Sequence, residues 1–93
     1  PNETFKKDFD LEYGSTSIEI QKNTSIRSGQ KIVIIDDLVA TGGTAIACGE
    51  LLTENFNINK SDILILCVID LPDLGGSELI KNQGYNIQTL VAY

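Results

Sequence analysis

The sequence predicts an open α/β fold built on a parallel sheet, and three observations lead to that class. Apolar runs of strand length, rich in Val and Ile, occupy residues 32–35 and 63–69. A stretch of helix length lies between them, over residues 43–56, and begins at a Gly-Gly-Thr turn. A strand, a helix and a strand at this spacing form a right-handed βαβ unit, whose strands are parallel and whose helix covers one sheet face.

The first element in chain order is a predicted β-hairpin over residues 5–22. Apolar and acidic residues alternate over residues 9–13 and again over 18–20, which is the period of a half-exposed strand. Residues 14–16, Gly-Ser-Thr, lie between these two runs. We therefore expect them to form a mobile turn at the tip of the hairpin.

The predicted βαβ unit follows, over residues 31–70. A Ser-Gly-Gln turn at 28–30 leads into residues 32–35, whose four β-branched apolar side chains indicate a buried strand. The helix over 43–56 is expected to present one apolar stripe to the core. That stripe consists of Cys48, Leu51, Leu52 and Phe56.

Weaker signals describe the end of the chain, which consists of a turn after the second apolar run and a terminal helix and strand over residues 75–93. Asp70 and Asp73 flank Pro72 after the second apolar run, which is typical of a turn with polar caps. A short helix is predicted from Gly76 to Asn82, followed by a strand over 87–92 at the sheet edge. Gly84 is the expected cap of that helix. The whole chain, 1–93, is predicted to form a single domain.

Composition and charge exclude several classes of partner. The net charge is −6, with seven basic residues and no histidine, so we expect no nucleic-acid partner. No apolar run approaches the roughly 18 residues that a membrane span requires, so we expect no membrane partner. Cys48 and Cys67 lack metal-site spacing and are interpreted as small buried side chains in a reducing compartment, which predicts a cytoplasmic protein.

One run of residues carries candidate chemistry. Asp36 and Asp37 stand at the carboxyl end of the first apolar strand, which is where open α/β sheets bind ligands. The Gly-rich turn that follows opens a helix, whose first amides and dipole favour an anion. Ionised carboxylates only accept hydrogen bonds, so the partners of the two aspartates are sugar hydroxyls or hydrated Mg²⁺. The run therefore predicts a site for a phosphorylated sugar.

Residues 32–44, Ile-Val-Ile-Ile-Asp-Asp-Leu-Val-Ala-Thr-Gly-Gly-Thr, closely resemble the signature that binds phosphoribosyl diphosphate (PRPP) in type I phosphoribosyltransferases. Leu-Glu-Tyr-Gly at 11–14, followed by Ser-Ile-Glu-Ile-Gln-Lys at 17–22, is similar to the flexible catalytic loop of the adenine phosphoribosyltransferases. The spacing between the two segments and the order of later elements also fit. The resemblance implies a type I phosphoribosyltransferase-like parallel sheet with flanking helices and a flexible hairpin loop.

The resemblance implies transfer of the 5-phosphoribosyl group from PRPP to adenine, giving AMP and pyrophosphate, with Mg²⁺ as cofactor. Asp36 and Asp37 would bind the ribose hydroxyls. The substrate would hold Mg²⁺ directly, and water molecules would link the ion to the two aspartates. Leu38 would pack on the purine, while Glu12 and Tyr13 would be the catalytic residues that close over the reacting centre. The 5′-phosphate would be held by Ala40, Thr41, Gly42, Gly43 and Thr44.

The resemblance covers the second half of the family's chain and implies a homodimeric enzyme. The family's amino-terminal hood and its pyrophosphate-binding Ser-Arg segment have no counterpart before Pro1. We therefore expect a chain truncated at its amino terminus and inactive in isolation.

Two alternative functions remain open. A non-catalytic PRPP-sensing regulatory domain would share the fold, but it would need a DNA-binding segment and a basic face. Another purine or pyrimidine phosphoribosyltransferase would share the PRPP run, although Leu-Glu-Tyr-Gly at 11–14 favours the adenine enzymes.

Overall fold

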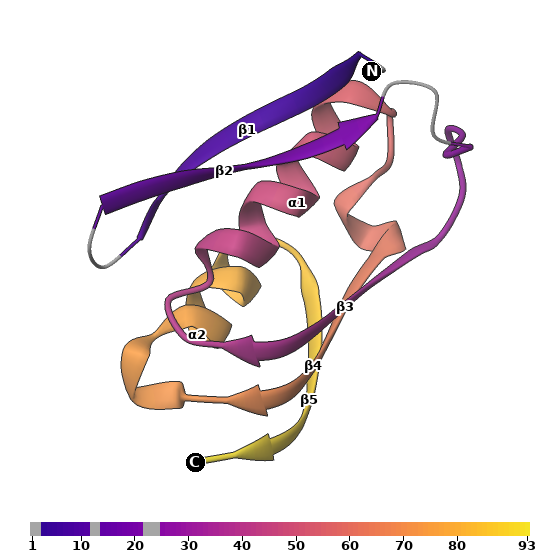
Figure 1. Ribbon diagram of the computed structural model, residues 1–93. Coiled ribbons are helices and arrows are strands. Elements are labelled where there is room, and N and C mark those ends of the chain that lie inside the picture. Colours follow the sequence, from indigo (N-terminus) through magenta and orange to yellow (C-terminus); the bar gives the residue numbers. More distant parts are fainter. Residues whose placement is uncertain (1–2, 12–13, 22–24) are drawn as a thin grey trace.

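The computed structural model describes residues 3–11, 14–21 and 25–93, which form three layers (Figure 1). An antiparallel hairpin lies along helix α1, and α1 and α2 cover one face of a three-stranded parallel sheet of order β3-β4-β5. The strands are β1 (Thr4–Leu11), β2 (Gly14–Gln21), β3 (Ile32–Val39), β4 (Ile63–Asp70) and β5 (Asn86–Ala92). The helices are α1 (Gly43–Asn55) and α2 (Gly76–Asn82), with 3₁₀ turns at Lys60–Asp62 and Pro72–Leu74.

The predicted strand-helix-strand unit is confirmed. β3 and β4 pair in parallel, with Ile34 opposite Ile65, and α1 connects them. The helix expected over 43–56 is α1, and the edge strand expected over 87–92 is β5. Gly84 follows α2 with φ of 96°, a left-handed conformation that glycine adopts without strain. Neither described helix has the length and apolar character needed to span a membrane.

The core lies between the sheet and the two helices. Alternate residues of the central strand, Ile63, Ile65 and Cys67, have no exposed surface. Because successive strand residues point to opposite faces, these three side chains all meet the helices. They pack with buried side chains from α1, α2 and the flanking segments, namely Val39, Ala45, Leu52, Ile58, Ile80 and Tyr85.

The prediction of a buried strand is wrong for one of its faces. Ile32 and Ile34 pack against the core, but Val33 is 54% exposed and Ile35 is 75% exposed. Both helices lie on the same side of the sheet, and no described segment covers the other side (Figure 1). Every second residue of β3 therefore meets solvent. A run of β-branched residues predicts a strand, but it does not show how many layers cover that strand.

β3 also continues beyond its predicted end. Asp36 and Asp37 belong to the strand, which ends only at Val39. Aspartate has a low preference for strands, but β4 offers backbone partners as far as the pair of Val39 and Asp70. The ladder hydrogen bonds outweigh the local preference. Asp70 is likewise not in the predicted polar turn, because it ends β4 and is only 7% exposed.

The hairpin is confirmed, but its predicted turn is misplaced. β1 and β2 pair from Thr4 opposite Gln21 to Leu11 opposite Gly14. Residues 14–16 therefore belong to β2 instead of forming the turn. A turn at 14–16 would pair residues 9–11 with 19–21, whereas the observed register pairs them with 14–16.

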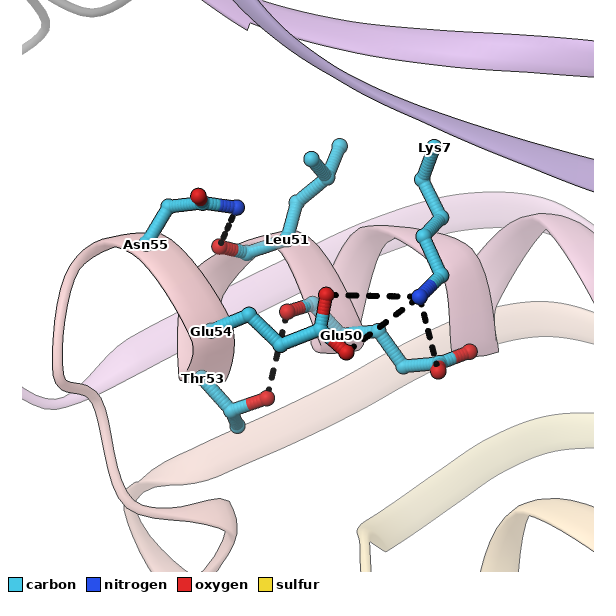
Figure 2. Close-up of polar contacts among 6 residues, drawn as sticks. All are labelled: Lys7, Glu50, Leu51, Thr53, Glu54 and Asn55. Atoms are coloured by element: carbon cyan, nitrogen blue, oxygen red, sulfur yellow. Dashed lines mark hydrogen bonds and ion pairs between the residues drawn. The ribbon is translucent and has the colours of Figure 1, made fainter.

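Helix α1 is covered on two sides, so its predicted single stripe is incomplete. Leu52 belongs to the core on the sheet side, whereas Ala47 and Leu51 are 1% exposed without belonging to that core. The hairpin runs along this other side of α1, and Leu51 points toward it (Figure 2). Cys48 and Phe56, which complete the predicted stripe, are only half-buried.

A small ion-pair cluster fastens the hairpin to α1 (Figure 2). The Lys7 ammonium lies 3.2 Å from a carboxylate oxygen of Glu50 and 3.2 Å from one of Glu54. Hydrogen bonds to Glu54 and Glu50 raise the pKa of Lys7 above its ordinary value, because they favour the charged ammonium. The rings of Phe5 and Phe56 meet edge to face with centroids 5.3 Å apart, which joins β1 to the end of the helix.

Replacing Lys7 with methionine is expected to loosen the hairpin without unfolding the core. Methionine keeps an apolar stem but removes the charge, and partly exposed ion pairs contribute about 1 kcal/mol or less. Hydrogen exchange of the β1 and β2 amides should become faster and lose its dependence on salt. Lys6→Met is the matched control, because Lys6 and Asp8 are largely exposed and 4.0 Å apart. Equal exchange rates in the two variants would contradict this role of Lys7.

Candidate functional site

A cavity of about 140 Å³ opens at the carboxyl end of β3. It is lined by Asp36 and residues 38–45, which form the end of β3, the connection to α1 and the first turn of α1. β3 and β4 end on the same side of the sheet because they are parallel (Figure 1). The cavity therefore lies at the edge where open α/β sheets bind ligands.

The β3–α1 loop, residues 40–44, places backbone amides around this cavity. Gly42 takes the N-cap position of α1 with φ of 89°, a left-handed conformation that favours glycine. No side chain among the described residues caps the helix, and its first turn carries no acidic residue. The first amides of α1 therefore keep their hydrogen-bonding capacity, and the positive end of the helix dipole faces the cavity. This arrangement suits an anion such as a phosphate.

The two predicted carboxylates differ in their positions. Asp36 is half-buried and lines the cavity, whereas Asp37 is exposed and is not among the lining residues. The Asp37 N–H donates to Oδ1 of Asp36 at 2.8 Å, which orients the Asp36 carboxylate. Its second oxygen is left to accept hydrogen bonds from a hydroxyl or from hydrated Mg²⁺. Asp36 is therefore the better placed of the two to meet a ligand in this cavity.

Besides Asp36, the predicted base residue and all five predicted phosphate residues line the same cavity. Leu38, Thr41 and Thr44 all line it, and all three are exposed. An exposed apolar side chain can stack against a flat ring, and a hydroxyl can donate to a phosphate oxygen. The structure thus brings the predicted sugar, phosphate and base residues together, while their individual roles stay predictions.

Both cysteines are held as neutral thiols. Burial raises the pKa of Cys48 and Cys67, and the nearby charge of Asp36 raises both further. Cys67 is fully buried and donates its thiol proton to the Ile69 carbonyl at 3.0 Å, while Cys48 is half-buried. Neutral thiols are poor nucleophiles and poor metal ligands. The interpretation of Cys67 as a small buried side chain is confirmed, and that of Cys48 is only partly so.

The predicted catalytic residues, Glu12 and Tyr13, lie outside the described residues. The strands on either side of them are described. The end of β1 and the start of β2 lie toward the same end of α1 as the carboxyl ends of the parallel strands (Figure 1). The assignment of Glu12 and Tyr13 to catalysis stays a prediction.

Two residues beside the β3–α1 loop were not among the predicted site residues: the sequence left only a peripheral role open for Asp70, and it indicated a structural role for Gly76. The Gly76 N–H donates to the Ala40 carbonyl at 2.9 Å, so the turn that opens α2 contacts the loop. Asp70 is buried, and its Oδ1 has no hydrogen-bond partner among the described residues. The Gly75-Gly76 pair is visible in the sequence, but it does not show which backbone Gly76 approaches.

The sequence matches a known domain family over most of its length. The profile of the family described as "Phosphoribosyl transferase domain" matches residues 4–76. The adenine phosphoribosyltransferase of Erythrobacter litoralis is 42% identical over 94 residues, a match that covers 100% of this chain and 50% of that protein. The chain spans about half the length of the curated relatives it matches.

Solved structures show the same similarity. The adenine phosphoribosyltransferase of Thermoanaerobacter pseudethanolicus superposes with a TM-score of 0.83 at 39% identity, covering 100% of this chain and 51% of that one. The adenine phosphoribosyltransferase of Saccharomyces cerevisiae was solved with adenine and an imino-altritol bisphosphate. It superposes with a TM-score of 0.81 at 38% identity, and the match covers 98% of this chain and 48% of the yeast chain. The predicted fold class is confirmed by these similarities.

Proposed function

The chain belongs to the phosphoribosyl transferase domain family, and we propose that it forms the phosphoribosyl-binding part of an adenine phosphoribosyltransferase. The proposed reaction transfers the 5-phosphoribosyl group of PRPP to N9 of adenine, with AMP and pyrophosphate as products. This is a purine salvage reaction. The names of the relatives support the choice of adenine among the possible bases.

One observation carries the proposal, namely the meeting of a carboxylate and a helix amino terminus in one cavity. Asp36 and the β3–α1 loop line the same cavity of about 140 Å³. A phosphate needs hydrogen-bond donors and positive potential, and ribose hydroxyls need acceptors. A phosphorylated ribose has both requirements on neighbouring atoms. The cavity thus matches the chemistry of the group that is transferred.

The residues of the cavity would act on different parts of the reaction. Departure of pyrophosphate leaves positive charge on the ribose ring, and the carboxylates of Asp36 and Asp37 would stabilise that charge. The β3–α1 loop would hold the 5′-phosphate, whose binding energy positions the reacting carbon. Leu38 would pack against the purine. Glu12 and Tyr13 are proposed to close over the centre and exclude water.

The carboxylates also fit a Mg²⁺ ion that arrives with the substrate. Mg²⁺ is commonly held by one or two carboxylates, water and substrate phosphates. Asp36 offers hard oxygen ligands in the cavity, and Asp37 is the next residue along β3. We propose that the substrate diphosphate holds most of the coordination sphere of this metal, as the resemblance implies. Bound there, Mg²⁺ would neutralise the leaving group. The resemblance to these enzymes also supports a cytoplasmic homodimer.

Calorimetric titration of the protein tests the proposed ligand. AMP is expected to bind at least about tenfold more tightly than adenosine, because only AMP carries the phosphate that the helix amino terminus would hold. AMP should also bind more tightly than GMP if adenine is the base. The protein that contains this chain should form AMP from adenine, PRPP and Mg²⁺.

The other outcomes distinguish the alternatives. Equal affinity for AMP and adenosine would contradict the assignment of a phosphate site to the β3–α1 loop. Equal affinity for AMP and GMP would favour another purine phosphoribosyltransferase. Tight binding of duplex DNA, controlled by PRPP, would favour a regulatory domain.

A further inference from the structure

The turn that opens α2 touches the β3–α1 loop from a distant part of the chain. The Gly76 N–H donates to the Ala40 carbonyl at 2.9 Å, and Gly76 is buried. This bond joins the first residue of the loop to the first residue of α2. The loop is thereby held from the side of α2 as well as by its own connections to β3 and α1.

Gly76 approaches the loop so closely that no larger residue fits. A Cβ atom placed there would overlap the Ala40 carbonyl oxygen and would lie 2.7 Å from the Gly42 nitrogen and 2.8 Å from the Thr41 carbonyl carbon. All three are backbone atoms, so no side-chain rotation relieves the overlap. Either the loop or the start of α2 would have to move.

The contact is also tight when it is considered from the loop, although less so. A Cβ on Gly42 would lie 3.0 Å from the Gly76 carbonyl oxygen and 3.2 Å from its Cα. Gly42 also has a left-handed φ of 89° and is the N-cap of α1. Two glycine backbones therefore pack directly against each other, and this packing sets the position of the N-cap whose neighbouring amides face the cavity.

We propose that Gly76 is a positioning residue for phosphate binding, acting through its backbone contact with Ala40 and Gly42. This inference rests on the proposed function, because it assumes that the β3–α1 loop holds the 5′-phosphate. A shift of about 1 Å in a binding group can lower the rate or affinity about a hundredfold. The bare backbone of Gly76 keeps the loop amides at the distance that a phosphate requires.

Gly76→Ala is the direct test, and Gly75→Ala is its matched control. Gly75 has a left-handed φ of 83° with nothing within 4 Å of an added Cβ, so alanine there strains the same turn without touching the loop. Calorimetry should show AMP affinity falling about tenfold to a hundredfold in Gly76→Ala. AMP affinity should stay within about twofold in Gly75→Ala, although its urea midpoint falls.

A second control separates loop displacement from loss of stability. Ile80 is fully buried in α2, so Ile80→Ala lowers the urea midpoint without adding an atom near the loop. It should keep the AMP affinity of the unmodified protein. In the enzyme assay, Gly76→Ala should raise KM for PRPP more than it lowers kcat, as expected when ground-state binding is lost.

The unmodified protein provides a test that does not depend on the folding of any variant. AMP should slow hydrogen exchange of the Gly76 amide, because ligand binding to the loop and the Gly76–Ala40 bond stabilise each other. Unchanged exchange at Gly76, or equal AMP affinity in Gly76→Ala and Gly75→Ala, would overturn the proposal while leaving the proposed function intact. Failure of the unmodified protein to bind AMP would overturn both.

Discussion

Replacing Asp36 and Asp37 together with asparagine is expected to lower kcat/KM for PRPP by about a hundredfold to a thousandfold, the range seen when one transition-state contact is removed. Asparagine keeps the size of the side chain and removes the negative charge that would stabilise the charged ribose. It also keeps a side-chain oxygen at position 36, which can still accept the 2.8 Å hydrogen bond from the residue 37 N–H. The local geometry is thus preserved while the electrostatics change.

The single variants should divide this effect unequally. Only Asp36 lines the cavity, so Asp36→Asn should account for most of the loss. Asp62→Asn is the matched control, because Asp62 precedes β4 at the opposite end of the sheet. Steady-state kinetics with PRPP as the varied substrate gives the comparison. Unchanged kcat/KM in the double variant would show that neither carboxylate takes part in the mechanism.

Replacing Gly43 with valine is expected to lower affinity for both AMP and PRPP. Gly43 is the first residue of α1 and lines the cavity, so a branched side chain there obstructs the approach of a phosphate to the loop amides. A hydrogen bond to a charged group contributes about 1.5–3 kcal/mol, so losing one weakens binding about tenfold to a hundredfold. Adenine, which has no phosphate, should bind as it does to the unmodified protein. Calorimetry with the three ligands measures the difference.

A glycine far from the cavity controls for the general effect of a branched residue. Gly29 lies in the turn before β3 with φ of 85° and open space around an added Cβ. Gly29→Val should lower stability through backbone strain and leave the affinities for AMP and PRPP unchanged. Equal losses for AMP, PRPP and adenine in Gly43→Val would indicate misfolding or a wrong assignment of the loop.

The candidate site was largely predictable because its parts are neighbours in the chain. Asp36 and the β3–α1 loop lie within nine consecutive residues, 36–44. The end of a strand, a glycine turn and the start of a helix are all local structures, and each has a local sequence signal. Placing them in order also places the carboxylate beside the amides. The prediction therefore needed no knowledge of the rest of the fold.

Predictions that depended on which backbone segments pair with each other were less successful. The alternation in residues 9–13 and 18–20 indicated a hairpin, but the turn was placed at residues that pair with 9–11. Asp70 follows a strand-like run and precedes Pro72, which favours a turn, yet pairing with Val39 keeps it in β4. In both cases the residue pairs with the backbone of another strand, and the local sequence does not predict which residue of that strand it pairs with.

The sequence by itself determined the order of strands and helices, the parallel βαβ unit and the composition of the β3–α1 loop, since these follow from backbone preferences and periodicity among neighbouring residues. Only the tertiary structure decided that Ile35 is exposed, that Leu51 packs under a hairpin and that Gly76 supports the loop. Each of these depends on which layer or backbone lies opposite a residue. Segments far apart in the chain meet only after folding, and their packing determines which surfaces water can reach.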